Sequence, residues 1–207
     1  MFITFEGIEG SGKTTQIKRL YEFLIKSGRD CVMTREPGGT AIGKKIRAIL
    51  LDPQSAAMDP FTELLLYTAD RVQHAQEILI PQLSSGKTVL CDRYFDATIA
   101  YQGYARGLDI ELINNLHQTM LRGLKPDVTI LLDLAPEKGL SRAWRQLNSG
   151  ARVENERRFE EEALAFHGQV RNGYLALARS EPERFRVIDA GQKETRVQEE
   201  ILKKLPL

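Results

Sequence analysis

The sequence predicts an α/β fold with a doubly wound, mainly parallel sheet of about five strands. Short apolar runs alternate along the chain with longer segments whose apolar residues recur at helical spacing. A glycine-rich loop joins the first apolar run to the first helical segment. No internal repeat, low-complexity stretch or linker interrupts this alternation, so we expect a single domain over residues 1–207.

Five apolar runs are predicted to be strands, because strands buried on both faces of a parallel sheet read as continuous apolar stretches. DVTILLDL is the most obvious of them. The others are FITFEGI at residues 2–8, the run CVMT from Cys31, the first part of GKTVLCDRY, and RFRVIDA near the carboxyl end.

The intervening segments are predicted to be helices. Apolar residues recur at helical spacing from Ile17 to Leu24, and Gly28 suits the end of a helix over residues 13–26. Asp59-Pro60 suits a helix start, and the pattern then continues to about Leu83. Further helices are expected over residues 41–51, about 96–102, 109–122, 136–147, about 158–180 and 193–204. The polar residues 148–156 are interpreted as part of a lid.

Composition and charge exclude some function classes. The chain has 207 residues and a formal net charge of +1, which argues against broad electrostatic binding to nucleic acid or membrane. No apolar run approaches the ~18 residues of a membrane span, and no leader precedes the first strand, so a cytoplasmic location is expected. Cys31 and Cys91 lie in apolar runs and are expected to be buried free thiols.

The glycine-rich loop fits the pattern G-x-x-x-x-G-K-[ST]. Glycines let backbone N–H groups wrap around phosphate oxygens, and the helix N-terminus that follows favours negative charge. Lys13 can reach the outer phosphates, and the Thr14 hydroxyl can bind Mg²⁺. The residues expected to contact the triphosphate are Gly7, Glu9, Gly10, Ser11, Gly12, Lys13, Thr14 and Thr15. This pattern predicts a site for a nucleoside triphosphate.

Three classes of nucleotide-binding protein carry such a loop. A GTPase normally carries an Asn-Lys-x-Asp motif that reads guanine, and this chain has none. A regulatory switch protein would leave the arginines beyond the loop without a role. The sequence favours a kinase that phosphorylates a small molecule, and a kinase for another nucleotide or for a nucleoside remains the nearest alternative.

Two arginines follow predicted strands at the end where ligands bind an open α/β sheet. Arg35 lies in TREPGGT after the second strand, and Arg93 lies in DRY after the third. Two guanidinium groups facing the phosphate loop suit an acceptor that already carries a phosphate. The alternative for each arginine alone is a surface ion pair.

Two carboxylates are candidate site residues. Asp92 lies where it can bind Mg²⁺, and its alternative role is a cap or turn. Glu9 lies within the phosphate loop, where a carboxylate accepts from the substrate or from metal-bound water, the alternative being a solvated loop charge. A phosphate acceptor needs no strong general base, and the three histidines are interpreted as ordinary helix residues.

The chain resembles the thymidylate kinase family over nearly its whole length. The carrying segments are FEGIEGSGKTTQ, TREPGGT, LLLYTADRVQH, CDRYFDATIAYQG and VRNGYLALA, with LLDL and VIDAGQ behind them. TREPGGT together with DRY and AYQG is specific to this family, whereas the phosphate loop alone is widely shared. The resemblance implies transfer of the γ-phosphoryl group of ATP to dTMP with Mg²⁺.

The resemblance also implies roles for individual residues. Tyr67 would stack on thymine, Arg71 would donate to the thymine O4, and Gln102 would lie near the N3 edge of the base. Tyr101 would pack by the sugar and disfavour a 2′-hydroxyl. The full implied substrate site is Glu9, Arg35, Glu36, Tyr67, Arg71, Arg93, Ala97, Tyr101 and Gln102, and the VIDAGQ segment adds Ala190, Gly191 and Gln192 on the ATP side.

The phosphate loop carries no basic residue besides Lys13, so the resemblance is to the bacterial type, which places arginines in a lid at about residues 142–160. Arg158 is the first choice for the cation that acts on the transferred phosphoryl group, and Arg142 for stacking on adenine. The family often has Asp-Arg where this chain has Arg157-Arg158, so Arg157 remains an alternative. The family often has Ser at Ala97, and its members carry a cis proline near Glu36–Pro37.

The resemblance implies a homodimer built on helix faces such as that of residues 62–83. The apolar helix faces alone would equally suit the core of a monomer. The sequence leaves open the rates, the preference among nucleoside monophosphates and the order of the lid without ligand.

Overall fold

The computed structural model describes residues 1–149 and 157–206. Within these residues the sheet has five strands in the order β2-β3-β1-β4-β5, and every neighbouring pair is parallel. The strands are β1 (Phe2–Glu6), β2 (Cys31–Arg35), β3 (Thr88–Asp92), β4 (Val128–Asp133) and β5 (Phe185–Asp189). The predicted fold class is therefore confirmed, with each strand inside or next to an apolar run that the sequence indicated.

Helices connect the strands as a parallel sheet requires. They are α1 (Lys13–Lys26), α2 (Ala41–Leu51), α3 (Pro60–His74), α4 (Ile80–Ser84), α5 (Phe95–Thr98), α6 (Ile110–Leu121), α7 (Pro136–Asn148), α8 (Leu164–Ser180) and α9 (Glu194–Lys204). A short 3₁₀ turn, η1 (Pro53–Ser55), precedes α3, whose N-terminus is capped by the Asp59 side chain.

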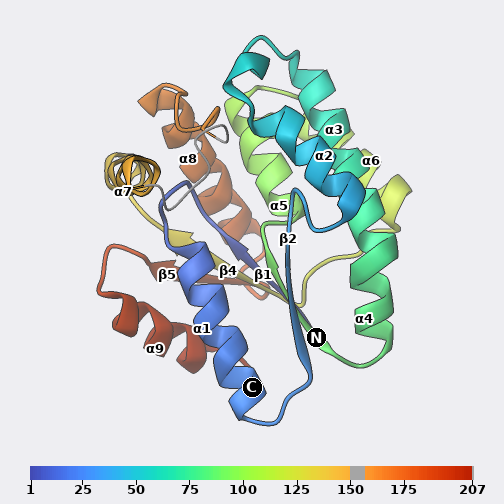
Figure 1. Cartoon of the computed structure of the whole chain (residues 1–207), viewed down its shortest axis with the longest axis vertical. Coiled ribbons are helices and arrows are strands. Elements are labelled where there is room, and N and C mark those ends of the chain that lie inside the picture. Colours follow the sequence, from blue (N-terminus) through green and yellow to red (C-terminus); the bar gives the residue numbers. More distant parts are fainter. Residues whose placement is uncertain (150–156, 207) are drawn as a thin grey trace.

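The sheet lies between two layers of helices (Figure 1). Helices α1 and α9 contact each other on one side, and α5 and α8 contact each other on the other. The core side chains between the layers include Ile3, Phe5 and Leu90, each fully buried. This packing fixes the strand ends, on which the candidate site is built.

Three features of the helices differ from the sequence-based expectation. Helix α8 begins at Leu164 rather than near residue 158, because residues 157–163 form turns that bury Arg158 and Phe159. The long helix from Pro60 to Ser84 contains a π-helical segment, η2 (Ala75–Leu79). A second π-helical segment, η3 (Ile99–Ala105), extends α5 beyond the predicted end at Gln102. Most of the predicted lid residues 148–156 lie outside the described residues, Arg152 among them.

The strand order brings three carboxyl ends together. Strand β3 lies between β2 and β1, and Asp92 on β3 is level with Arg35 on β2 and with Phe5 on β1. The phosphate loop follows β1, so the loop, Arg35 and Asp92 meet at one edge of the sheet.

Candidate active site

The glycine-rich loop has the shape that its sequence predicts. Gly7, Gly10 and Gly12 have φ angles of 138°, 69° and 94°, a region that side chains disfavour. The Lys13 ammonium donates to the carbonyl oxygens of Gly7 and Ile8 at 2.9 and 2.8 Å. Burial, reinforced by the neighbouring Arg93, lowers the pKa of Lys13 to about 8. The loop therefore presents its backbone and one lysine at the N-terminus of α1.

The loop also packs backbone to backbone against helix α7. A Cβ atom at Gly10 would lie 2.1 Å from the carbonyl oxygen of Gly139, and one at Gly139 would lie 2.5 Å from that of Glu9. Neither contact leaves space for a side chain. Helix α7 is thus held directly against the phosphate loop.

Thr14 and Asp92, the two residues predicted to bind Mg²⁺, lie together. The Thr14 hydroxyl donates to Oδ2 of Asp92 at 3.2 Å. A hydroxyl and a carboxylate are hard oxygen ligands of the kind that Mg²⁺ uses when phosphates and waters supply the remaining positions. The part of the chain that the structure describes holds no group of three or more His, Cys, Asp or Glu side chains suited to a metal. A magnesium ion here would therefore depend on phosphate oxygens as well.

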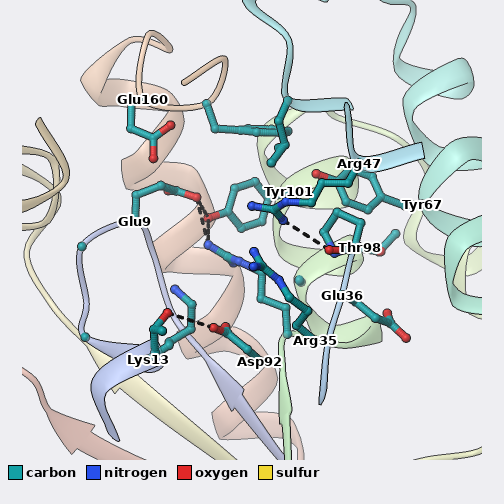
Figure 2. A pocket seen from close by; sticks show the side chains of 18 of the residues that line it. Glu9, Lys13, Arg35, Glu36, Arg47, Tyr67, Asp92, Thr98, Tyr101 and Glu160 are labelled. Carbon is teal, nitrogen blue, oxygen red and sulfur yellow. Dashed lines mark hydrogen bonds and ion pairs between the residues drawn. The ribbon is translucent and has the colours of Figure 1, made fainter. Parts of the chain in front are cut away.

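One cavity of about 660 Å³ opens beside the loop, a size typical of small-molecule sites. Arg35 reaches into it from β2 and Arg47 from α2, while Glu9 and Lys13 lie across from them (Figure 2). Of the predicted site residues, those lining the cavity are Glu9, Gly10, Gly12, Lys13, Thr14, Thr15, Arg35, Glu36, Tyr67, Asp92, Arg93, Ala97, Tyr101 and Gln102. A single space therefore joins the phosphate loop to the predicted base pocket.

Arg93 is the centre of a hydrogen-bond network on the cavity wall. Its guanidinium donates to Oε1 of Glu9 at 2.9 Å and to the hydroxyls of Tyr101 and Tyr174 at 2.9 and 3.0 Å. The Tyr101 hydroxyl donates to the same oxygen of Glu9. Arg93 has a φ of 68°, which is unusual for a side-chain-bearing residue and is typical of functional positions. These bonds fix the direction of its positive charge.

Glu9 is held ionised in this network. Burial alone would raise its pKa, but the adjacent His167 imidazole and the charge of Arg93 together move the pKa well below its usual range. The Nδ1 atom of His167 lies 3.2 Å from Oε2 of Glu9, and the His167 side chain is fully buried. His167 was interpreted from sequence as an ordinary helix residue, and its spacing gave no sign of this contact.

Glu6, at the end of β1, lies below the same network and behaves in the opposite way. It accepts hydrogen bonds from the Tyr94 N–H and from the Tyr174 hydroxyl at 2.7 Å each. Burial and the charge of Asp96 raise its pKa to about 8, because its environment disfavours a second negative charge. The pKa values of Glu6 and Glu9, two carboxyl groups on one short segment, are thus shifted in opposite directions.

The predicted base pocket lies at the far end of the cavity, where Tyr67, Ala97 and Gln102 line the wall. Arg71 lies beneath this wall and is not among the lining residues. It donates to Oε2 of Glu36 and to the Thr98 hydroxyl, at 2.8 Å each. Glu36 and Thr98 do line the cavity, so Arg71 supports two wall residues.

The lid arginines are placed differently from one another. Arg158 is 3% exposed, pairs with Glu63 at 2.7 Å and donates to the carbonyl of Leu50, so the structure does not bring it to the cavity. Arg157 is more exposed and pairs with Glu161. The roles predicted for both remain predictions.

The predicted adenine-side residues are brought together. Arg142 on α7 donates to the carbonyl oxygen of Ala190 at 3.1 Å. Gly191 and Gln192 follow directly: the Gly191 N–H donates to the Asp189 carboxylate, and the Gln192 side-chain amide donates to the Asp189 backbone carbonyl at the end of β5. Helix α7 and the loop after β5 thus form one surface near the phosphate loop.

Several lining residues were not predicted. Arg47, Thr98, Gln146, Phe159 and Glu160 line the cavity, and Arg47 also donates to the carbonyl of Pro37 at 3.2 Å. In the sequence, Arg47 cannot be distinguished from the other charged residues of its helix. Only the packing of α2 against α3 shows that its side chain points into the cavity. Glu160 lies in a segment that was predicted to be helical and that forms turns in the structure.

Other expectations concern the rest of the chain. The Glu36–Pro37 peptide bond is cis, as the resemblance suggested. Cys31 and Cys91 are both buried free thiols, as predicted. Among the described helices, none combines the length and hydrophobicity needed to cross a bilayer.

Comparison with known proteins gives a consistent result. The thymidylate kinase family model matches residues 5–201. A thymidylate kinase of Desulfosudis oleivorans is 58% identical over 92% of this chain and 89% of its own length. One of Desulforapulum autotrophicum is 56% identical over 98% of this chain and 89% of its own. The solved structure of a thymidylate kinase from Ehrlichia chaffeensis is 36% identical, has a TM-score of 0.77, and shares 98% of this chain and 97% of that one.

The matched residues contain both the phosphate loop and the cavity described above, and the structural match extends over the whole sheet. The fold, the loop and the relatives lead to one conclusion, which is that this chain belongs to the thymidylate kinase family.

Proposed function

We propose that this chain transfers the γ-phosphoryl group of ATP to the phosphate of dTMP, giving ADP and dTDP. The observation that carries the proposal is the single cavity with a phosphate loop at one end and an aromatic, amide-bearing pocket at the other. Arg35, Arg47 and Arg93 line the space between the two ends. An acceptor that carries a phosphate on a flat base fits this arrangement.

On the ATP side, the loop amides and Lys13 would bind the β- and γ-phosphates. Arg142 would stack on adenine, next to Ala190, Gly191 and Gln192, and its contact with the Ala190 carbonyl supports this placement. Thr14 and Asp92 would hold Mg²⁺, which neutralises phosphate charge when bound.

The acceptor needs no general base, because a phosphate monoester is mostly a dianion at pH 7. An oxygen of the dTMP phosphate attacks the γ-phosphorus, and the bond to the bridging β–γ oxygen breaks in line with it. Arg35 and Arg93 would hold the acceptor phosphate, with Arg47 as an additional cation. Catalysis then comes from positioning and from the charges that surround the transferred group.

On the base side, Tyr67 would stack on thymine and Gln102 would face its N3 edge. Ala97 and Glu36 would complete the pocket, and Tyr101 would pack by the sugar. Arg71 would act on the O4 of the base, either directly or through the Thr98 hydroxyl that it holds. The hydroxyl of Thr98 supplies a polar group next to Ala97, where a serine is common in the family.

For the lid cation, the placement of the arginines favours Arg157 over Arg158. Arg158 already pairs with Glu63 and is nearly fully buried, whereas Arg157 is about one third exposed. We therefore propose that Arg157 acts on the transferred phosphoryl group. Closure of the lid over ATP would exclude water from the reaction.

A homodimer is the proposed assembly, and a cytoplasmic location remains the expectation from the sequence. Helices α2, α3 and α6 carry large apolar side chains that are about half exposed, and such residues mark interaction surfaces. They include Ile42, Ile49, Phe61, Leu65 and Met120. A second copy of the chain would cover them.

The test is ADP release from MgATP with dTMP, dUMP, dCMP, AMP, GMP or thymidine as acceptor. We expect release with dTMP to exceed release without acceptor by at least about a hundredfold. The Lys13→Ala variant should fold normally and lose nearly all of this turnover. Strong preference for another monophosphate would show that the base pocket is misassigned, and release that ignores every acceptor would refute a kinase of small molecules.

A further inference from the structure

A buried carboxylate, Glu63 on α3, lies directly behind the predicted base pocket. It is 0% exposed, and donors face both of its oxygens. Oε1 accepts from the Gln102 amide nitrogen at 2.7 Å and from Nε of Arg106 at 3.3 Å. Oε2 accepts from Nη2 of Arg106 at 3.3 Å and lies 2.7 Å from Nη2 of Arg158. With four donors around it, this carboxylate has its full complement of partners.

This arrangement dictates the orientation of the Gln102 amide. A carboxylate can only accept hydrogen bonds, so the end of the amide that faces Glu63 must be its NH₂ group. The carbonyl oxygen is then the end left for the cavity, which Gln102 lines. Among the described residues no hydrogen-bond donor to this oxygen is found. The cavity therefore meets an acceptor at this position and not a donor.

A pyrimidine ring distinguishes these two possibilities at N3. Thymine and uracil carry a hydrogen on N3 and donate it, whereas neutral cytosine has a lone pair there and can only accept. A site built to accept a hydrogen bond rejects a ligand that lacks the donor, because its buried oxygen would be left unpaired. The orientation of the Gln102 amide thus decides whether a base with a donor or a base with an acceptor at N3 fits the pocket.

We propose that Glu63 is a positioning residue for base selection, which holds the Gln102 carbonyl toward the N3–H of the pyrimidine. Glu63 does not touch the substrate and acts only through Gln102. The proposal rests on the proposed function, because it assumes that the base occupies the pocket lined by Tyr67 and Gln102. Arg106 and Arg158 balance the charge of Glu63, whereas the orientation of the amide depends only on the bond between Glu63 and Gln102.

The Glu63→Gln variant tests this proposal with almost no change of shape. Its new amide oxygen would take the Oε2 position and face Nη2 of both Arg158 and Arg106, and its NH₂ group would take the Oε1 position and face Gln102 and Nε of Arg106. Gln102 then has to turn its carbonyl toward residue 63 and its NH₂ group toward the cavity. We expect kcat/KM for dTMP to fall, kcat/KM for dCMP to rise, and their ratio to fall at least about tenfold.

Two controls separate orientation from structural damage. Glu63→Asp shortens the side chain and weakens the ion pairs but keeps an acceptor-only group, so the dTMP-to-dCMP ratio should stay within about twofold of wild type. Arg106→Gln removes one partner of Glu63 and leaves the bond to Gln102, so it should lower the melting temperature without changing the ratio. If Glu63→Gln alone does not fold, Glu63→Gln combined with Arg106→Gln restores the charge balance and should show the same fall in the ratio.

The outcomes are distinct. If wild type prefers dTMP and the Glu63→Gln ratio is unchanged, or falls no more than that of Glu63→Asp, the positioning role is refuted while the proposed function stands. If wild type shows no preference for dTMP, the proposed function fails first. A fall in the ratio confined to the variants with Gln at position 63 supports the role of Glu63.

Discussion

This molecule contains two buried arginine–glutamate ion pairs that have similar distances but differ in their exposure to the cavity. Arg93 bonds to Glu9 at 2.9 Å and Arg158 to Glu63 at 2.7 Å. The side chains of the first pair are 18% and 9% exposed, and those of the second are 2% and 1% exposed. The first pair lies on the cavity wall, and the second lies behind it.

The difference shows why a lid arginine cannot be assigned from its motif alone. The guanidinium of Arg158 is enclosed by a carboxylate and a backbone carbonyl, so its charge is already balanced. The guanidinium of Arg93 donates to one carboxylate and to two neutral tyrosine hydroxyls, and it lies on the wall of the open cavity. A buried arginine acts on a ligand only when some of its N–H groups face that ligand.

The largest effect is expected from replacing the arginine that faces the cavity. Arg93→Met removes a charge that, under the proposed function, holds the acceptor phosphate for transfer, so kcat should fall about a thousandfold. Steady-state turnover with dTMP measures this, and Arg19→Met, which breaks an exposed pair with Glu194, is the matched control with normal kcat. Turnover near the wild-type value would erase the functional distinction between the two pairs.

The enclosed arginine should instead affect stability. Arg158→Met leaves Glu63 without its nearest cationic partner, and breaking a buried pair in this way costs about 3–5 kcal/mol of unfolding free energy. Urea denaturation checks this, again against Arg19→Met, which should cost less than about 1 kcal/mol. A thousandfold loss of kcat at unchanged stability would restore Arg158 as the lid cation.

A smaller effect, on the pH dependence of stability, is expected from Glu6, which lies below the Arg93–Glu9 pair. Its pKa is about 4.5 when unperturbed and about 8 in the fold, so the folded chain holds a proton that the unfolded chain has lost. Stability should therefore fall as pH rises from about 4.5 to about 8. Glu6→Gln cannot ionise, and the difference between its unfolding free energies at pH 5.5 and 8 should be smaller than that of wild type by at least about 1 kcal/mol. Equal slopes would show that Glu6 is ionised in both states.

The sequence was sufficient for the elements whose residues carry local information. The apolar runs predicted the strands, and the spacing of Gly7, Gly12, Lys13 and Thr14 predicted the phosphate loop. The strand-end rule also placed Arg35 and Asp92 correctly beside it. The residues on the cavity wall followed from the family resemblance, since nothing in periodicity separates Tyr67 from a core aromatic.

The parts that were missed depend on tertiary contacts. Residues 158–163 have a helical pattern, yet they form turns in which Phe159 packs edge-on against Tyr101. Arg47 and His167 are single polar residues on helices, and only the packing of those helices turns them toward the cavity and toward Glu9. The π-helical segments η2 and η3 have no sequence pattern of their own. Local spacing cannot reveal a direction that another element imposes.

The close contact between Gly10 and Gly139 has a mechanical consequence. Because two backbones touch without side chains between them, the phosphate loop and the first turn of α7 form one rigid part. The same helix carries Arg142, so under the proposed function this rigid part would contact ATP at both its base and its phosphates. Under that function, the distance between the adenine contact and the phosphate contacts would be set by this backbone contact and would not depend on the lid.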